Sequence, residues 1–181
     1  MERFSYQGEV FYISGTMIAD ASFLMPPESL RAEIAKAYCD GKDLSALSES
    51  ELLNVFRLCK ENGALRTCID AGQAYLNRVE GFPIEVRRIL PIMTAAYRQL
   101  NEPNMAIALN REMHGKYGRD VFSVPLYTSV AAAYCDVGDF ETAKKVCDYA
   151  YFRQGGGTGE KNELSLVYRR ILKQTTGSGS F

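Results

Sequence analysis

LYTSVAAAYCDVGDFETAKKVCDYAYFRQ, residues 126–154, is the stretch that decides the predicted fold. Its first half repeats apolar and small side chains at helical spacing, at Tyr127, Val130, Ala131 and Tyr134. Its second half does the same at Phe140, Ala143, Cys147 and Ala150. Gly138 stands between the halves, where a chain leaving a helix often needs a positive φ, and Asp139 can cap the next helix. The stretch predicts one helix–turn–helix unit.

The same turn recurs twice upstream. Gly63, Asn101 and Gly138 lie 38 and 37 residues apart, and asparagine is the usual substitute for glycine in left-handed backbone. A small residue follows each turn by five positions: Cys68, Ala106 and Ala143. A filling residue precedes each turn by four positions: Cys59, Tyr97 and Tyr134. Because closely crossing helices need a small side chain at the crossing, this recurrence predicts three antiparallel helix pairs.

The recurrence resembles tetratricopeptide repeats, whose hallmarks are a helical pair, a glycine-containing turn, a tyrosine shortly before it and an alanine five residues after it. The resembling stretches lie near 49–80, 87–119 and 124–157, and the last matches best. The second has Asn101 in place of glycine and Met113 where a small residue is usual. The resemblance implies an all-α solenoid of stacked antiparallel helix pairs, with a groove that generally binds extended peptides or partner helices.

The rest of the chain predicts elements at both ends of this stack. Helices are expected near 26–40, 49–62, 64–79, 83–100, 103–117, 122–137, 139–153 and 161–174. Ser48 and Glu51 have capping-box spacing at the start of the second helix. Aromatic and β-branched residues in 4–18 predict a short β-hairpin. The last helix, with Asn162 as its cap, is expected to cover the open end of the stack with Leu164, Tyr168, Ile171 and Leu172.

Three regions are therefore expected. Residues 1–25 form a β-ribbon and an apolar tract packed on the body, residues 26–174 form the helical repeat domain, and residues 175–181 form a disordered tail or tag remnant. Residues 155–159 are expected to be a flexible connector. The tract that should pack on the body comprises Met17, Ile18, Phe23, Leu24 and Met25.

Composition excludes several classes of function. The chain has 181 residues, 46% of them apolar and 24% charged, and its net charge of −1 offers no general attraction to nucleic acids or anionic membranes. It contains no apolar run long enough to span a membrane and no apolar secretory signal at its start. A cytoplasmic protein without a cofactor is expected.

The cysteines and the single histidine predict no metal site. Cys39, Cys59, Cys68, Cys135 and Cys147 form no C-x-x-C pair, and their odd number argues against a full disulfide framework. They are expected to be buried, reduced thiols, with a redox role for Cys59 and Cys68 as the alternative. His114 alone gives a zinc site of cysteine and histidine ligands almost nothing to work with.

No motif predicts catalysis. The segment GGGTGEKN at 155–162 differs from a phosphate-binding loop, because Glu160 separates Gly159 from Lys161 and Asn162 stands where Ser or Thr should coordinate magnesium. Acidic pairs such as Glu49 and Glu51 fall in first helical turns, where they complement the helix dipole. We therefore expect no catalytic, cofactor-binding or metal-binding residue.

The remaining candidate is the groove implied by the resemblance. Its expected lining comes from the first helix of each pair: Leu53, Arg57, Lys60, Arg88, Arg98, Thr128, Ala132 and Cys135. The arginines could fork two hydrogen bonds to an acidic segment or a C-terminal carboxylate of a protein partner. The alternative is that they are solvated surface.

Three functions remain open. The first is a non-enzymatic scaffold or adaptor that binds a peptide or partner helix. The second is a self-associating structural protein that dimerises through its N-terminal ribbon. The third is a helical-repeat enzyme or ligand sensor with an unrecognised pocket.

Overall fold

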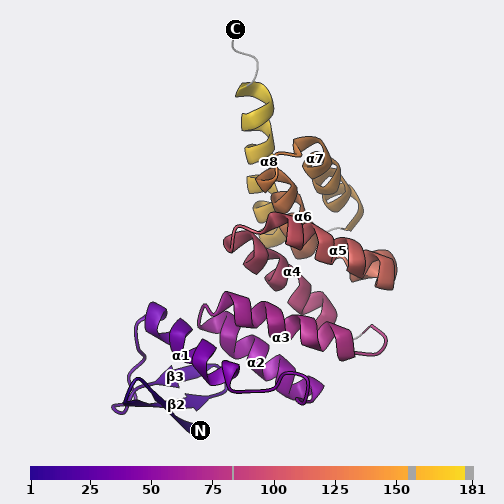
Figure 1. The fold of residues 1–181 in the computed structure, drawn as a ribbon. Coiled ribbons are helices and arrows are strands. Elements are labelled where there is room, and N and C mark those ends of the chain that lie inside the picture. Colours follow the sequence, from indigo (N-terminus) through magenta and orange to yellow (C-terminus); the bar gives the residue numbers. More distant parts are fainter. Residues whose placement is uncertain (83, 155–157, 178–181) are drawn as a thin grey trace. The chain divides into compact units, whose positions relative to one another are not determined.

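The computed structural model describes residues 1–82, 84–154 and 158–177. The fold is mostly helical with a small N-terminal antiparallel sheet, and the chain divides into two compact units, Met1–Gly81 and Phe82–Phe181 (Figure 1). The first unit contains the sheet and helices α1 (Glu28–Asp40), α2 (Glu49–Glu61) and α3 (Leu65–Arg78). The second contains α4 (Ile84–Gln99), α5 (Pro103–Tyr117), η1 (Gly118–Val121), α6 (Val124–Asp136), α7 (Phe140–Tyr149), η2 (Ala150–Gln154) and α8 (Thr158–Gly177).

The N-terminal sheet has one strand more than the predicted hairpin. Strands β1 (Glu2–Tyr6), β2 (Glu9–Ser14) and β3 (Met17–Ala19) pair antiparallel in that order. Gly15, at φ 59°, opens the two-residue connection between β2 and β3, so the chain turns back at once and Ile18 pairs with Ile13. The start of the predicted apolar tract is therefore the third strand.

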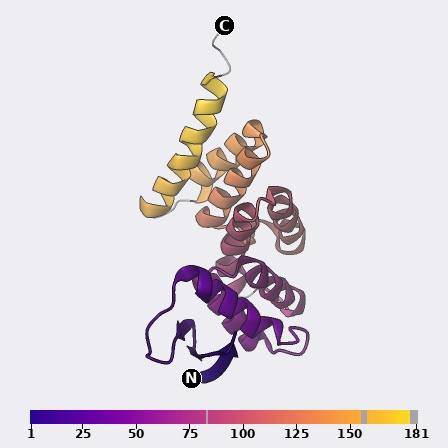
Figure 2. The ribbon, with the colours of Figure 1, turned by 60° about the vertical axis from the view of Figure 1, so that its left-hand side comes forward.

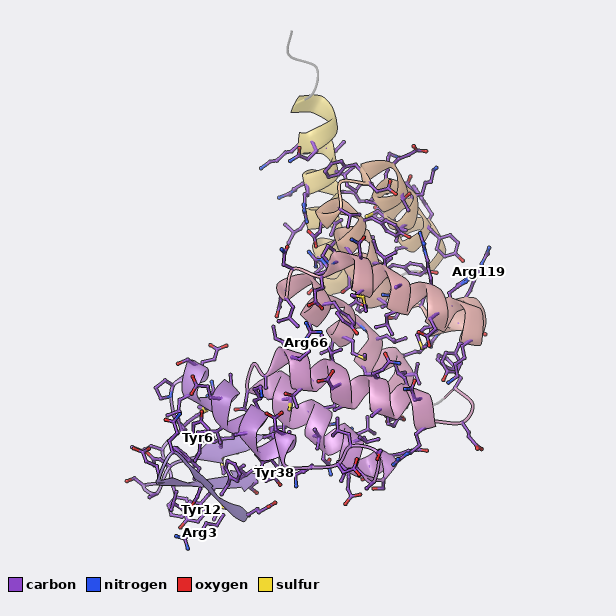
Figure 3. The ribbon with its side chains drawn as sticks, in the orientation of Figure 1. Arg3, Tyr6, Tyr12, Tyr38, Arg66 and Arg119 are labelled. Carbon is purple, nitrogen blue, oxygen red and sulfur yellow. The ribbon has the colours of Figure 1, made fainter. Side chains whose placement is uncertain are left out.

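One face of the sheet packs on the helices of the first unit. Phe11, Ile13 and Ile18 are buried. The ring of Phe4 meets that of Tyr38 on α1 edge to face, with centroids 5.5 Å apart. Asn62, after α2, donates from Nδ2 to the backbone carbonyl of Thr16 at 2.9 Å. Figure 3 labels Tyr38 beside the sheet. These contacts hold the sheet against α1 and α2.

The predicted apolar tract begins in β3 and continues into the loop after it, and most of its side chains point to solvent, contrary to the expectation that the tract packs on the body. Met17, Phe23, Leu24 and Met25 are exposed, while Ile18 is buried. The carboxylate of Asp20 accepts hydrogen bonds from the backbone N–H groups of Ser22 at 2.8 Å and Leu24 at 2.9 Å. This short loop turns its apolar side chains outward. Among them, the ring of Phe23 stacks on the ring of Tyr12.

The predicted turns between paired helices are confirmed. Gly63, Asn101 and Gly138 have φ values of 78°, 59° and 80°. The backbone N–H that follows each turn donates to the carbonyl five residues back: Ala64 to Cys59 at 2.9 Å, Glu102 to Tyr97 at 2.8 Å and Asp139 to Tyr134 at 2.9 Å. This is the hydrogen bond of a glycine-type helix C-cap, repeated three times. The small residues after the turns, Cys68, Ala106 and Ala143, are fully buried.

The starts of helices α2 and α7 are also as predicted from the sequence. Both bonds of the capping box are present, since Ser48 N–H donates to Glu51 Oε2 at 2.8 Å and Glu51 N–H donates to Ser48 Oγ at 3.3 Å. Asp139 caps α7 by accepting from the N–H of Thr142 at 3.0 Å.

Helix α6 is the centre of the second unit. It contacts α4, α5, α7 and α8, and nine of its residues are buried: Val124, Leu126, Tyr127, Thr128, Val130, Ala131, Ala132, Ala133 and Cys135. Figure 2 shows it among the helices of this unit, with α8 in yellow. A helix that is apolar on every side needs neighbours on every side.

Helix α8 differs from its prediction at both ends. It begins at Thr158, so Asn162 lies within the helix and cannot cap it, and it runs through residues 175–177, which were expected in a disordered tail. Leu164 and Ile171 are buried as expected, but Leu172 is exposed. Part of the expected connector, residues 155–157, and residues 178–181 lie outside the described part of the chain.

Candidate functional site

A groove of about 390 Å³ lies between α5 and α7, with α6 as its base, and is called the α5–α7 groove. Its lining is Ile107, Asn110, Arg111, His114, Arg119, Phe122, Tyr127, Val130, Tyr134, Lys145, Val146 and Tyr149. All of these residues belong to the second unit. The groove therefore needs no contribution from the first unit.

Aromatic rings form the wall of the α5–α7 groove. Phe122, just after η1, stacks on Tyr127 of α6 with centroids 4.9 Å apart, and Tyr127 meets Tyr149 of α7 at 5.3 Å. The aliphatic side chains of Ile107 and Val130 lie beside them and are buried. Phe122 and Tyr127 are themselves buried and Tyr149 is half-buried, so Tyr149 is the ring of this wall that is most open to a ligand.

Positively charged groups stand at the rim. Arg119 lies over the ring of Tyr149, 5.7 Å from its centroid, and Figure 3 shows it at the end of α5. Arg111 is exposed and has no hydrogen bond or ion pair to any described residue. Lys145 pairs with Glu141 at 2.6 Å, although both side chains are largely exposed. Because no described lining residue is acidic, the rim favours an anionic ligand.

A buried amide lies at the bottom of the groove. Asn110 donates from Nδ2 to Thr94 Oγ1 at 2.9 Å and to the carbonyl of Ala106 at 2.7 Å. Its Oδ1 is buried and has no partner among the described residues. Burying an acceptor without a partner costs free energy, so Oδ1 of Asn110 has hydrogen-bonding capacity that the described residues do not use.

The groove lining predicted from the sequence is divided between the two units. Arg57, Lys60 and Arg88 are exposed, whereas Leu53 and Arg98 are half-buried. The α6 residues of that lining are buried: Thr128, Ala132 and Cys135. None of these three belongs to the lining of the α5–α7 groove, and α6 is contacted by α4, α5, α7 and α8; that they line a peptide groove stays a prediction. The hydroxyl of Thr128 donates to the carbonyl of Val124 in its own helix at 2.9 Å.

Arg98 is engaged in an ion-pair network that the sequence did not predict. Its Nε donates to Asp136 Oδ2 at 2.6 Å, and Nη1 of Arg170 donates to Asp136 Oδ1 at 2.6 Å. Burial alone would raise the pKa of Asp136, but the hydrogen bonds from Arg98 and Arg170 outweigh it and hold that pKa below its ordinary value. The network joins α4, α6 and α8, so Arg98 is bound to protein rather than offered to a ligand.

Sequence reasoning missed most of the α5–α7 groove. The expected groove lay on the first helix of each pair, whereas Arg111, Arg119, Lys145 and Tyr149 come from the second helices and from η1. The sequence contained one signal. The residues at positions 107, 110, 111 and 114 of α5 share one helical face, none of them is acidic, and the last two are Arg111 and His114.

Within residues 1–82, 84–154 and 158–177, no three potential metal-ligating side chains cluster. None of the described helices has the length and apolar character that crossing a bilayer requires. Part of the GGGTGEKN segment, residues 155–157, lies outside the described residues.

Comparisons with protein-family models, with curated proteins and with solved structures found no match to this chain. Its functional assignment therefore depends on the geometry and chemistry of the α5–α7 groove.

Proposed function

We propose that the chain is a non-enzymatic scaffold or adaptor of the helical-repeat type that binds an acidic peptide segment in the α5–α7 groove. The observation that carries the proposal is the pairing of an aromatic wall with a basic rim in a groove whose described lining has no acidic residue. The partner is a protein or peptide that supplies carboxylates, either from acidic side chains or from its C-terminus.

The helical-repeat class is supported by the recurring turns. Three helix pairs end their first helix with left-handed backbone at Gly63, Asn101 and Gly138, and each bury a small residue five positions later. This is the feature in which the chain resembles tetratricopeptide repeats. In the second unit α6 also contacts both helices of the preceding pair, which is the contact pattern of stacked repeats.

A peptide segment fits the groove better than a folded surface does. A volume of about 390 Å³ accommodates a few side chains and lies at the lower end of the range of roughly 300–1,000 Å³ that is usual for ligand pockets. An apolar side chain of the peptide would contact Tyr149, the least buried of the three rings. Neighbouring carboxylates would meet Arg111 and Arg119, whose guanidinium groups can each donate two hydrogen bonds to one carboxylate.

Binding to the isotope-labelled full chain tests this proposal. The probe is a library of short acidic peptides that each contain one aromatic residue, and binding is followed by amide chemical shifts in NMR. The expected result is saturable shifts at α5, η1 and α7, weakening as salt is added because the rim charges are exposed. Saturable shifts confined to other helices, or none at high peptide concentration, would reject the groove as the site.

A second candidate, self-association through the N-terminal unit, is favoured by one observation. The loop after β3 exposes Phe23, Leu24 and Met25 at 63%, 65% and 67% of their full surface. Adjacent exposed apolar side chains often mark a contact with another protein. Light scattering of the wild type and of a variant with all three replaced by Ser tests this second candidate. A dimer lost in the variant favours self-association, and a wild-type monomer rejects it.

A further inference from the structure

Two cysteine thiols of the first unit lie in direct contact. Cys59 Sγ, on the last turns of α2, is 3.5 Å from Cys39 Sγ at the end of α1, and donates a hydrogen bond to it. Both cysteines are free and almost fully buried, with exposures of 2% for Cys39 and 0% for Cys59. The redox alternative predicted from the sequence involved Cys59 and Cys68, whereas in the structure Cys59 has a hydrogen bond to Cys39, because α1 packs on α2.

The environments of the two thiols differ. The hydrogen bond from Cys59 lowers the pKa of Cys39, against the opposing effect of burial, and the positive charge of Lys42 acts in the same direction. The same hydrogen bond and burial raise the pKa of Cys59. Burial raises the pKa of Cys68 to about 12 and that of Cys147 to about 12. Of these thiols, Cys39 most readily provides a thiolate, and Cys59 is positioned to react next.

We propose that Cys39 and Cys59 form a redox modification site that a small peroxide, such as hydrogen peroxide, converts to a disulfide. The Cys39 thiolate attacks one peroxide oxygen, an S–O bond forms, and the O–O bond breaks to release hydroxide, which is protonated to water. The sulfur of Cys59 then attacks Cys39 Sγ, the S–S bond forms, and the departing hydroxide takes the proton of Cys59 as water. The two thiols together lose two electrons, and the peroxide is reduced to two waters.

The position of the pair explains what the modification would do. Hydrogen peroxide is little larger than water, so it can reach a thiol that retains only slight exposure, whereas bulky disulfides cannot. The disulfide would join the end of α1 to the end of α2 and close the intervening chain into a covalent loop, restricting the unfolded state. The α5–α7 groove belongs to the second unit, so this inference does not depend on the proposed peptide binding.

Peptide mapping of the wild-type full chain tests the inference. The folded protein is treated with hydrogen peroxide, remaining thiols are blocked with N-ethylmaleimide, and tryptic peptides are analysed by mass spectrometry. The expected product links peptide 37–42, which contains Cys39, to peptide 58–60, which contains Cys59, and disappears on treatment with dithiothreitol. It should form at least about tenfold faster than any oxidised form of Cys147, because thiolate content falls tenfold per unit of pKa above the ambient pH.

Three variants identify the role of each sulfur. Cys59→Ser should accumulate a sulfenic acid at Cys39, detected as its dimedone adduct, and Cys39→Ser should leave Cys59 reduced. Cys68→Ser is the matched control in the same unit and should form the disulfide at the wild-type rate. Circular dichroism establishes that each variant is folded. A wild-type protein in which 37–42 and 58–60 stay unlinked, or in which Cys147 oxidises as fast, would overturn the proposal.

Discussion

The side-chain amide of Asn110 on α5 donates a hydrogen bond of 2.9 Å to the hydroxyl of Thr94 on α4, and both side chains are buried. Thr94 in turn donates from its hydroxyl to the carbonyl of Leu90 at 2.7 Å. The link is polar and lies inside an otherwise apolar helix pair, so it fixes how α4 and α5 face each other beneath the α5–α7 groove.

Replacing Thr94 by Val should lower the free energy of unfolding by about 1–3 kcal/mol, because Nδ2 of Asn110 loses a buried acceptor. Thr128→Val is the matched control. Thr128 is also buried, but its hydroxyl bonds only to its own helix, so the loss should stay below about 0.5–1 kcal/mol. Chemical denaturation of both variants measures the difference, and equal losses would show that the α4–α5 link has no special role.

Ala143→Arg should unfold the second unit, with a loss above about 4 kcal/mol. Ala143 has no exposed surface, and a long charged side chain at this helix crossing brings both overpacking and desolvation. Ala108→Arg, at an exposed position of α5, is the control and should melt like the wild type. A cooperative, wild-type melting curve for Ala143→Arg would mean that the α6–α7 pairing is wrongly described.

Gly138→Ala should cost about 1–2 kcal/mol, the strain of a side chain in left-handed backbone, since φ there is 80°. A methyl group at this glycine would meet no atom within 4 Å, so crowding adds nothing. Gly115→Ala makes the same substitution within α5, also in open space, and should instead stabilise by about 0.5–1 kcal/mol. Calorimetry should therefore find melting temperatures shifted in opposite directions; two shifts of the same sign would contradict the turn assignment.

Acid should weaken the second unit through Asp136. Its folded pKa lies below the ordinary value near 4, so the ion pairs with Arg98 and Arg170 stabilise fully above roughly pH 4 and are lost as pH falls through the folded pKa. Asp136→Asn should lower the stability at neutral pH by about 1–2 kcal/mol, a range reduced for the partial exposure of the three side chains. The variant should also show a smaller difference than the wild type between its melting temperatures at neutral and at acidic pH. If this difference is the same in the variant and in the wild type, the acid sensitivity comes from other carboxylates.

Local signals in the sequence predicted most of the helices and their turns. A capping box such as Ser48 with Glu51, or a left-handed residue such as Asn101, acts within a few residues, so its spacing alone specifies the structure. The third strand was missed because Met17 and Ile18 continue an apolar run without a strong turn signal after Gly15.

The candidate site was harder to predict than the fold, because it depends on which helix faces are covered. Helical spacing shows that Thr128 and Cys135 lie on one side of α6, but only the packing of the second unit shows that this side is closed. Contacts between distant residues, such as Arg98 with Asp136 or Cys39 with Cys59, leave no spacing that a single sequence could reveal.

The measurement that tests the central claim most directly is the affinity of a selected acidic peptide, labelled with fluorescein and followed by anisotropy, for two charge-removing variants. Arg111→Ser with Arg119→Ser should weaken binding by about tenfold or more, since charge-assisted hydrogen bonds at the rim of the α5–α7 groove are lost. Replacing Arg57 and Arg88 together by Ser, the two exposed arginines expected from the sequence, should leave the affinity nearly unchanged. The reverse pattern, or equal affinities for both variants and the wild type, would contradict the assignment of the peptide site to the α5–α7 groove.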